Sequence, residues 1–173
     1  AYFPEGHKRQ QDQRPAVVFF FGGGWNGGSP SQFAPHCEYL ASRGMVAMTA
    51  DYRVKSRQGT TPFDCVEDGK SAIRYVRQHA KKLGVDLNRI AAGGGSAGGH
   101  VAAATATVPG LESEDENKKI SSKPDALILF NPVYDNGPKG YGYDRVQGRH
   151  LEISPIHNLR KGVPPSIVFL GDQ

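Results

Sequence analysis

The chain has 173 residues, which suits one domain with a sizeable buried core rather than two domains. Its net charge of +4 is mild and its basic residues are scattered, which argues against a nucleic-acid-binding or membrane-surface protein. No apolar run approaches membrane-spanning length, and no signal-peptide pattern is visible. The first residue is Ala1 rather than Met, so a removed leader and an excised fragment both stay open. We therefore assign no compartment, and a soluble, secreted or periplasmic protein is compatible with the sequence.

Five short apolar runs predict buried β-strands. They are continuous rather than alternating, which is typical of strands covered on both faces and hence of a parallel sheet. The runs span residues 16–21, 45–50, 89–92, 126–130 and 166–170.

The strongest helical pattern spans residues 62–83, where apolar residues recur at intervals of three and four. Thr61 can act as its N-cap, Pro62 fits the first helical position, and Gly84 ends it. Further helices are predicted over residues 31–43 and 97–106. Because helices alternate with strands, the pattern predicts an α/β fold with a doubly wound, mostly parallel sheet.

Two stretches interrupt this alternation within the single domain predicted for residues 1–173. Residues 112–123 are densely charged, which predicts a solvated surface loop. Residues 132–165 form a long stretch that is rich in Gly and Pro. A loop of this length in a compact domain is usually functional, so we expect a lid or a substrate-loop insertion.

Ser96 lies in a Gly-x-Ser-x-Gly motif between a predicted strand and a predicted helix. A nucleophilic serine in this context sits on a sharp turn, and Gly94 and Gly98 flank it because a Cβ there would collide with the adjacent strand and helix. The alternative is a phosphate-binding turn, which would favour Gly-x-Gly-x-x-Gly near the first strand and an acid about 20 residues later. We therefore predict that Ser96 is a catalytic nucleophile.

A second glycine-rich loop, at residues 19–25, directly follows the first predicted strand. It can turn two backbone N–H groups towards the carbonyl oxygen of a substrate, and the Ala97 N–H would complete an oxyanion hole. The alternative is a glycine turn that only reverses the chain.

The two cysteines, Cys37 and Cys65, have no metal-ligand spacing, so we expect two buried thiols. No metal or organic cofactor is indicated.

The motifs resemble the acetyl-esterase and hormone-sensitive-lipase-like esterases of the α/β-hydrolase superfamily over nearly the whole chain. The matching segments are residues 21–25 (FGGGW), residues 51–53 (DYR), Asp68 and residues 94–100 (GGSAGGH). The resemblance implies an eight-stranded, mostly parallel sheet. It also implies hydrolysis of carboxylic esters, often of short acyl or acetyl groups on small molecules or carbohydrates.

Carried over residue by residue, the resemblance implies that Ser96 is the nucleophile and that Gly23, Gly24 and Ala97 supply the oxyanion N–H groups. One departure is Phe21, which stands where the family usually has His and cannot brace the loop through a side-chain hydrogen bond. The backbone donors do not depend on that side chain.

Residues around these motifs have secondary interpretations. Trp25 is a candidate substrate-binding residue, as are three tyrosines of the long loop, at positions 134, 141 and 143. We expect Arg53 to pair with Asp68 in a structural role. His100 lies one helical turn beyond Ser96, and the turn geometry is expected to point it away from the serine hydroxyl.

The acid and base that a serine nucleophile needs are not evident. In this fold the acid follows the strand at residues 166–170, where Asp172 is the candidate and no histidine comes later. The resemblance places the acid three residues after a glycine such as Gly171, immediately beyond Gln173. We therefore expect a fold that is incomplete at both ends, and a chain that is inactive alone.

Two histidines between Ser96 and that strand offer another arrangement. His157, paired with Asp135 or Asp144, could act as the base, and His150 is also available, but each requires a different chain order. Three functions remain to be separated: a serine carboxylesterase acting on small-molecule esters, a prolyl-oligopeptidase-like peptidase, and a non-catalytic binding protein of the same fold. The sequence does not indicate the oligomeric state.

Overall fold

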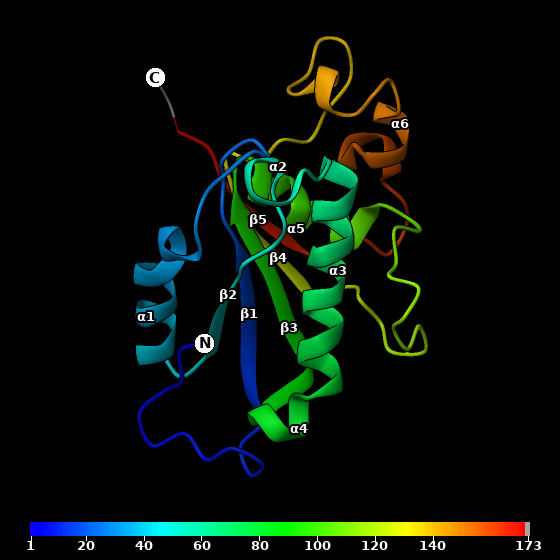
Figure 1. Ribbon diagram of the computed structural model, residues 1–173. Coiled ribbons are helices and arrows are strands. Elements are labelled where there is room, and N and C mark those ends of the chain that lie inside the picture. Colours follow the sequence, from blue (N-terminus) through cyan, green and yellow to red (C-terminus); the bar gives the residue numbers. More distant parts are fainter. Residues whose placement is uncertain (172–173) are drawn as a thin grey trace.

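The computed structural model describes residues 1–171, whose centre is a five-stranded parallel sheet (Figure 1). The strands lie in the order β2-β1-β3-β4-β5, so the chain starts near one edge and winds outwards in both directions. Their bounds are β1 Arg14–Phe20, β2 Val46–Ala50, β3 Val85–Gly95, β4 Ala126–Phe130 and β5 Ser166–Phe169. All five strands coincide with the apolar runs of the sequence, and the predicted parallel sheet is confirmed. The resemblance implies eight strands, of which residues 1–171 contain these five.

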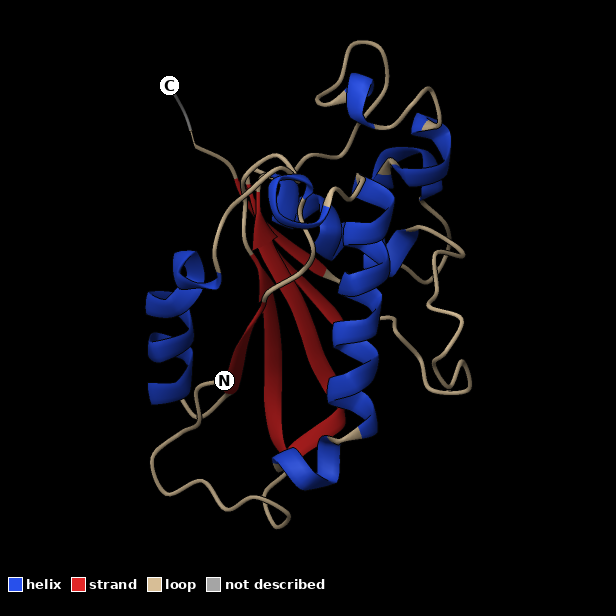
Figure 2. Ribbon diagram, viewed as in Figure 1, coloured by secondary structure: helices blue, strands red, loops and turns tan. Residues whose placement is uncertain are grey.

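Helices cover both faces of the sheet (Figure 2). On one face, α1 packs its buried Cys37 against a cluster that includes Phe19 and Phe33. On the other face, α3 and α5 pack against the larger core cluster. The helical elements are η1 Pro30–Phe33, α1 Ala34–Ser42, α2 Lys55–Gln58, α3 Pro62–Gln78, α4 Ala80–Leu83, α5 Ala97–Thr107, η2 Tyr143–Arg145, α6 His150–Ile153 and η3 Pro155–Asn158. This arrangement is the doubly wound α/β fold predicted from the sequence.

The predicted helix at residues 62–83 is divided in two at His79. The backbone there has φ −102° and ψ 14°, and the His79 ring nitrogen Nδ1 lies 2.8 Å from the carbonyl oxygen of Tyr75. The same carbonyl also accepts the His79 backbone N–H at 3.0 Å, and α4 follows as a separate turn. Both ends agree with the prediction: the Asp64 carboxylate accepts the Thr61 N–H at 2.8 Å, and Gly84 is left-handed with φ +68°.

The strand β3 extends beyond its apolar run at both ends, starting at Val85 and continuing through three glycines to Gly95. A Cβ on Gly93 would lie 2.5 Å from the Phe19 ring, so the aromatic side chain occupies the space that a larger residue would need. The glycines therefore continue the strand, and the turn begins only at Ser96. The strand therefore leads directly to Ser96 without an intervening loop.

The charged segment at residues 112–123 is anchored to α3, so the prediction of a solvated loop is wrong for part of it. Glu112 pairs with Lys70 and Arg74, and Glu116 also pairs with Arg74. Both cations are almost fully buried. Burial alone would raise the pKa of Glu112, but hydrogen bonding and charge from the two cations outweigh it, so its pKa lies below the usual value.

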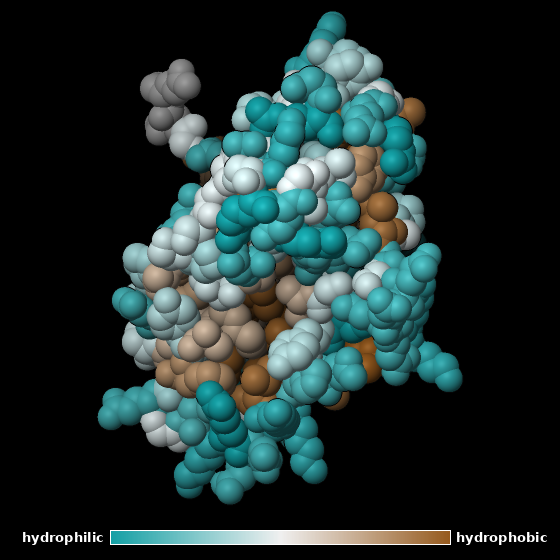
Figure 3. All heavy atoms as spheres, viewed as in Figure 1, coloured by the Kyte–Doolittle hydropathy of each residue, from teal (hydrophilic) through white to brown (hydrophobic). Residues whose placement is uncertain are grey.

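The two edges of the sheet are less covered than its centre. Every residue of β5 is exposed, and the last three residues of β2 are half-buried. In the space-filling view, apolar atoms gather over β1 and β2 between α1 and α3, with hydrophilic residues around them (Figure 3).

Cys37 and Cys65 are both free and buried, as expected. Within residues 1–171, no helix combines the length and hydropathy needed to span a membrane.

Candidate active site

Ser96 occupies a strained turn between β3 and α5. Its φ of 52° and ψ of −119° lie far from the conformations that side-chain-bearing residues normally adopt. Three backbone hydrogen bonds hold it there: its N–H donates to Phe130 at 3.0 Å, and its carbonyl accepts from His100 at 3.0 Å and Val133 at 3.3 Å. Ser96 is exposed while the residue after it is buried. The surrounding structure thus fixes an exposed serine in a conformation that it would not adopt alone.

The glycines beside Ser96 are required by close backbone contacts. A Cβ on Gly94 would lie 2.5 Å from the backbone of Gly98, at the start of α5. A Cβ on Gly98 would clash with the carbonyl oxygens of Phe20 and Phe21, at the end of β1. The elbow and the end of β1 therefore touch through glycine, as the sequence analysis expected.

The glycine-rich loop after β1 lies directly beside Ser96. A Cβ on Gly22 would be 3.3 Å from the Ser96 Cβ. Gly23 and Gly24 have φ values of +137° and +61°, a region that favours glycine. The motif at residues 19–25 and the elbow, which are separated by about 70 positions in the chain, therefore meet at the carboxyl ends of β1 and β3.

Four backbone groups of this loop have hydrogen-bond partners. The Phe21 carbonyl accepts from the Tyr52 hydroxyl at 2.6 Å, and the Gly22 N–H donates to Gln32 Oε1 at 2.6 Å. Further on, the Gly23 carbonyl accepts the N–H groups of Asn26 (3.0 Å) and Gly27 (3.2 Å), and the Gly24 carbonyl accepts from Arg145 Nη1 (2.7 Å). These contacts fix the orientation of successive peptide groups.

The three predicted oxyanion donors are left free by this bracing. Within residues 1–171, the N–H groups of Gly23, Gly24 and Ala97 donate no hydrogen bond. The first two belong to a loop beside Ser96, and the third is the first residue of α5, where the helix dipole is positive. Backbone donors held in place and lacking a partner are what an oxyanion hole requires.

The Phe21 side chain supports the loop by packing. Its ring is buried and stacks on Tyr52 with centroids 4.2 Å apart and an interplanar angle of 16°. Burial raises the pKa of Tyr52, so its hydroxyl keeps the proton that it donates to the Phe21 carbonyl. Stacking and this hydrogen bond together brace the loop without the histidine usual in the family.

His100 is buried and points away from the Ser96 hydroxyl, as expected. Its Nδ1 accepts the Trp25 indole N–H at 3.2 Å, so its Nε2 carries the proton and donates to the Ile153 carbonyl at 3.1 Å. Burial lowers the pKa of His100 to about 4. With both ring nitrogens occupied, His100 is a structural residue.

Trp25 is also largely structural. Its side chain is 1% exposed, its ring meets His100 edge to face at 5.1 Å, and its backbone has φ 56°. This environment favours packing over the substrate contact predicted for it. Of the tyrosines, Tyr141 and Tyr143 are exposed and Tyr134 is partly buried.

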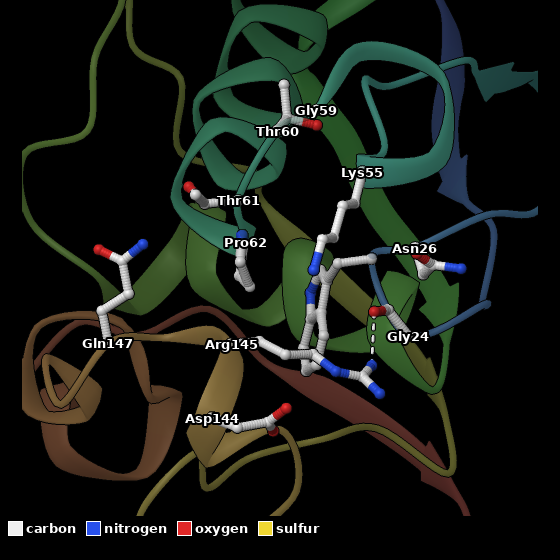
Figure 4. A pocket seen from close by; sticks show the side chains of 11 residues that line it. Gly24, Asn26, Lys55, Gly59, Thr60, Thr61, Pro62, Asp144, Arg145 and Gln147 are labelled. Carbon is white, nitrogen blue, oxygen red and sulfur yellow. Dashed lines mark hydrogen bonds between the residues drawn. The ribbon is translucent and has the colours of Figure 1, made fainter.

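A polar pocket of about 430 Å³ lies beside the glycine loop (Figure 4). Its wall includes Gly24 and Trp25 from the loop, Lys55 from α2, and Arg145 from η2. The Lys55 and Arg145 side chains both point into this space in Figure 4. Two cations therefore face a cavity next to a predicted oxyanion donor.

The other predicted residues are placed as follows. Arg53 donates to Asp68 at 2.7 Å, which confirms the structural pair. His157 Nε2 lies 3.6 Å from Asp135 Oδ1, and both side chains are about two-fifths exposed. Within residues 1–171, no hydrogen bond joins the Ser96 hydroxyl to a histidine, so this pair stays an untested alternative. Asp172 lies outside the described residues.

Three bracing residues were missed by the sequence analysis: Gln32, Tyr52 and Arg145. Tyr52 lies in the motif at residues 51–53, in which the sequence predicts a role only for Arg53. Gln32 and Arg145 carry no local signal, because each acts through one contact with a distant backbone group.

Comparison with known proteins identifies the family. The BD-FAE family model matches residues 2–136. The apo form of Thermogutta terrifontis esterase 2 is 54% identical, with a TM-score of 0.91, over 96% of this chain and 63% of that one. Esterase LipC of Mycobacterium tuberculosis is 31% identical over 92% of this chain and 44% of its own length. The probable carboxylic ester hydrolase LipM of the same organism is 34% identical over 91% of this chain and 40% of its length.

The chain thus spans less than half the length of these two curated relatives and under two thirds of the solved esterase. The family match nevertheless covers the sheet from β1 to β4, the glycine loop and the elbow. By this match and by its parallel sheet, the chain belongs to the BD-FAE family of α/β-hydrolase-fold esterases.

Proposed function

We propose that this chain carries the nucleophile and the oxyanion hole of a serine carboxylesterase. The observation that carries the proposal is the exposed Ser96 on its strained elbow, beside three backbone N–H groups without acceptors. A binding protein would have no use for a serine held in this conformation. The esterases among the relatives support the same reaction class.

In the proposed reaction, the Ser96 Oγ attacks the carbonyl carbon of an ester as a base removes its proton. The carbonyl oxygen becomes an oxyanion that accepts hydrogen bonds from Gly23, Gly24 and Ala97. The tetrahedral intermediate expels the alcohol, which takes a proton, and leaves an acyl group on Ser96. Water then attacks the acyl-enzyme and releases the carboxylic acid. The acid and base are not assigned among the described residues.

Short-chain esters are the proposed substrates. Structures of Thermogutta terrifontis esterase 2 are described as propionate-bound and butyrate-bound, at 53% and 52% identity to this chain. Those two carboxylates correspond to the acid product of short acyl esters. We extend this preference to the present protein, with segment 132–165 proposed as the insertion that shapes access to the site.

The test is a comparison of p-nitrophenyl butyrate with an aminoacyl anilide, using the full-length protein and its Ser96→Ala variant. We expect turnover of the ester, little turnover of the anilide, and loss of both in the variant. Preferential anilide cleavage would favour the peptidase alternative. Ester turnover that survives Ser96→Ala would disprove the proposed mechanism.

A further inference from the structure

The polar pocket beside the glycine loop is close enough to Ser96 to receive part of an ester bound there. A Cβ on Gly22 would lie 3.3 Å from the Ser96 Cβ, and Gly24, two positions later, belongs to the pocket wall. Since consecutive Cα atoms are about 3.8 Å apart, the Gly24 Cα lies within about 12 Å of the Ser96 Cβ. The pocket volume of about 430 Å³ is typical of small-molecule sites. One substrate can therefore react at Ser96 and place a second group in this pocket.

Arg145 is a restrained cation in the pocket wall. Its Nη1 donates to the Gly24 carbonyl at 2.7 Å, drawn as a dashed line in Figure 4. Its guanidinium lies 5.3 Å from the centre of the Tyr141 ring and 6.0 Å from that of Trp25. Among residues 1–171, Nε and Nη2 donate no hydrogen bond, and no carboxylate lies within ion-pair distance. A guanidinium that is held in place and keeps unused N–H groups suits a carboxylate ligand.

Lys55 brings a second positive charge to the same space from α2. Its backbone N–H donates to the Trp25 carbonyl at 3.0 Å, which ties the start of α2 to the glycine loop. Its side chain points into the pocket in Figure 4, and within the described residues its ammonium has no carboxylate partner. The neighbouring Arg57, by contrast, pairs with Asp51 at 2.6 Å. The charge of Lys55 is therefore directed at the cavity rather than at a carboxylate of the protein.

The acidic side of the pocket does not balance these two cations. Asp144 is the only carboxylate that residues 1–171 contribute to the wall, and it lies outside ion-pair distance of both Lys55 and Arg145. Two cations against one carboxylate leave the pocket with a net positive charge. A cleft lined by charge of one sign concentrates ligands of the opposite sign. A neutral acyl group or alcohol would use neither cation.

We propose that this pocket binds a carboxylate carried by the ester substrate, with Arg145 and Lys55 as its binding residues. The inference rests on the proposed esterase function and adds to it a preference among esters. The preferred substrates carry a free carboxylate several bonds away from the reacting ester group. Because the two cations act on a remote part of the substrate, they raise kcat/KM for acidic esters over neutral esters of the same length.

The experiment measures kcat/KM of the full-length protein for two matched pairs of esters. In the first pair the acyl group carries the charge: mono-p-nitrophenyl adipate is compared with p-nitrophenyl hexanoate. In the second pair the alcohol carries it: para-acetoxybenzoate is compared with its methyl ester. The ratio of acidic to neutral ester is taken for each protein, and comparing ratios between proteins cancels the intrinsic reactivities of the esters. The pair that responds identifies the side of the ester that occupies the pocket.

The variants Lys55→Met and Arg145→Met remove one pocket cation each. Lys55→Met is expected to lower the ratio in at least one pair by about 3–10-fold, because Lys55 is exposed and its charge is partly screened. Arg145→Met is expected to lower the same ratio by about tenfold or more, since it removes a restrained charged donor. Asp144→Asn is expected to raise that ratio, because it removes the opposing charge. Added salt is expected to lower the ratio of the wild type.

Lys82→Met is the matched control, because Lys82 is exposed on α4, at the end of the sheet opposite α2 (Figure 1). It is expected to leave both ratios within about twofold of the wild type, because charges well beyond a Debye length are screened. If Arg145→Met fails to fold, the exposed Lys55 carries the test. The inference is overturned if Lys55→Met leaves both ratios unchanged, if Lys82→Met lowers them equally, or if Asp144→Asn lowers them.

The neutral esters separate this inference from the proposed function. Hydrolysis of p-nitrophenyl hexanoate that survives Ser96→Ala would defeat the proposed function itself. An inactive Ser96→Ala, together with ratios that do not depend on Lys55, would leave the esterase function standing and defeat only the carboxylate pocket.

Discussion

The buried His100 predicts a specific pH dependence of folding stability. The His100 ring is neutral in the folded protein, since burial lowers its pKa from 6.5 to about 4. Both ring nitrogens are hydrogen-bonded, to Trp25 and to Ile153, in a way that only the neutral ring with its proton on Nε2 can satisfy. Protonation would break the bond from the indole and leave a charge without a partner.

The sign and size follow from proton linkage. Between pH 6.5 and 4 the unfolded chain binds a proton at this position and the folded chain does not, so stability falls as the pH falls through this window. Above pH 6.5 the contribution is fully present. At about pH 4.5 the loss amounts to roughly 2.5 kcal/mol in the free energy of unfolding.

Urea denaturation of the wild type and of His100→Gln, near pH 7 and near pH 4.5, tests this reasoning. At neutral pH the variant should be less stable by about 2 kcal/mol, because it loses packing and two buried hydrogen bonds. At the lower pH that gap should close or reverse, since the variant has no histidine to protonate at this position. A gap of the same size at both pH values would refute the assignment of a buried neutral ring.

Other substitutions test the remaining parts of the structure. Glu112→Gln should lower the free energy of unfolding, measured by urea titration, by about 3–5 kcal/mol, because it removes a carboxylate that pairs with two buried cations. Glu114 is exposed, so Glu114→Gln should change the same free energy by under about 0.5 kcal/mol. Gly98→Ala should abolish ester turnover by pushing the end of β1 and its loop away from the elbow. Gly27→Ala should retain most of the turnover, because its Cβ would make only an ordinary contact with the Ser56 hydroxyl at 3.7 Å. Equal activities of the two variants would contradict the packing argument. Tyr52→Phe should cost about 1–3 kcal/mol of stability by removing the only hydroxyl that reaches the Phe21 carbonyl among residues 1–171. Unfolding of this variant at the wild-type midpoint would show that water replaces the hydroxyl.

Local patterns were sufficient to predict most of the fold. Each of the five strands was found because parallel strands covered on both faces leave continuous apolar runs. The extension of β3 through its glycines was missed, because consecutive glycines in a sequence indicate a turn. Only the Phe19 ring, which fills the space beside Gly93, explains why glycine stands in a strand here. The break at His79 was missed because the apolar residues keep their helical spacing across it, from Ile73 and Val76 to Ala80 and Leu83.

The candidate site divides in the same way. Ser96 and the glycine loop were recognised from short motifs, because their backbone conformations require glycine at fixed positions. The bracing by Gln32 and Arg145 was not, since each contact joins segments far apart in the sequence and involves a backbone acceptor or donor that any residue could offer. The anchoring of Glu112 on α3 was missed because a charged run has the same composition whether its carboxylates face solvent or buried cations.

The central claim, that Ser96 is the nucleophile, is tested most directly by covalent labelling. Thermogutta terrifontis esterase 2, 54% identical to this chain, is described as phosphorylated by paraoxon. Incubation of the full-length protein with paraoxon, followed by peptide mass mapping, should place one diethylphosphoryl group on Ser96 and none on any residue of Ser96→Ala. A folded protein that remains unlabelled, or that carries the adduct on another residue, would contradict the account.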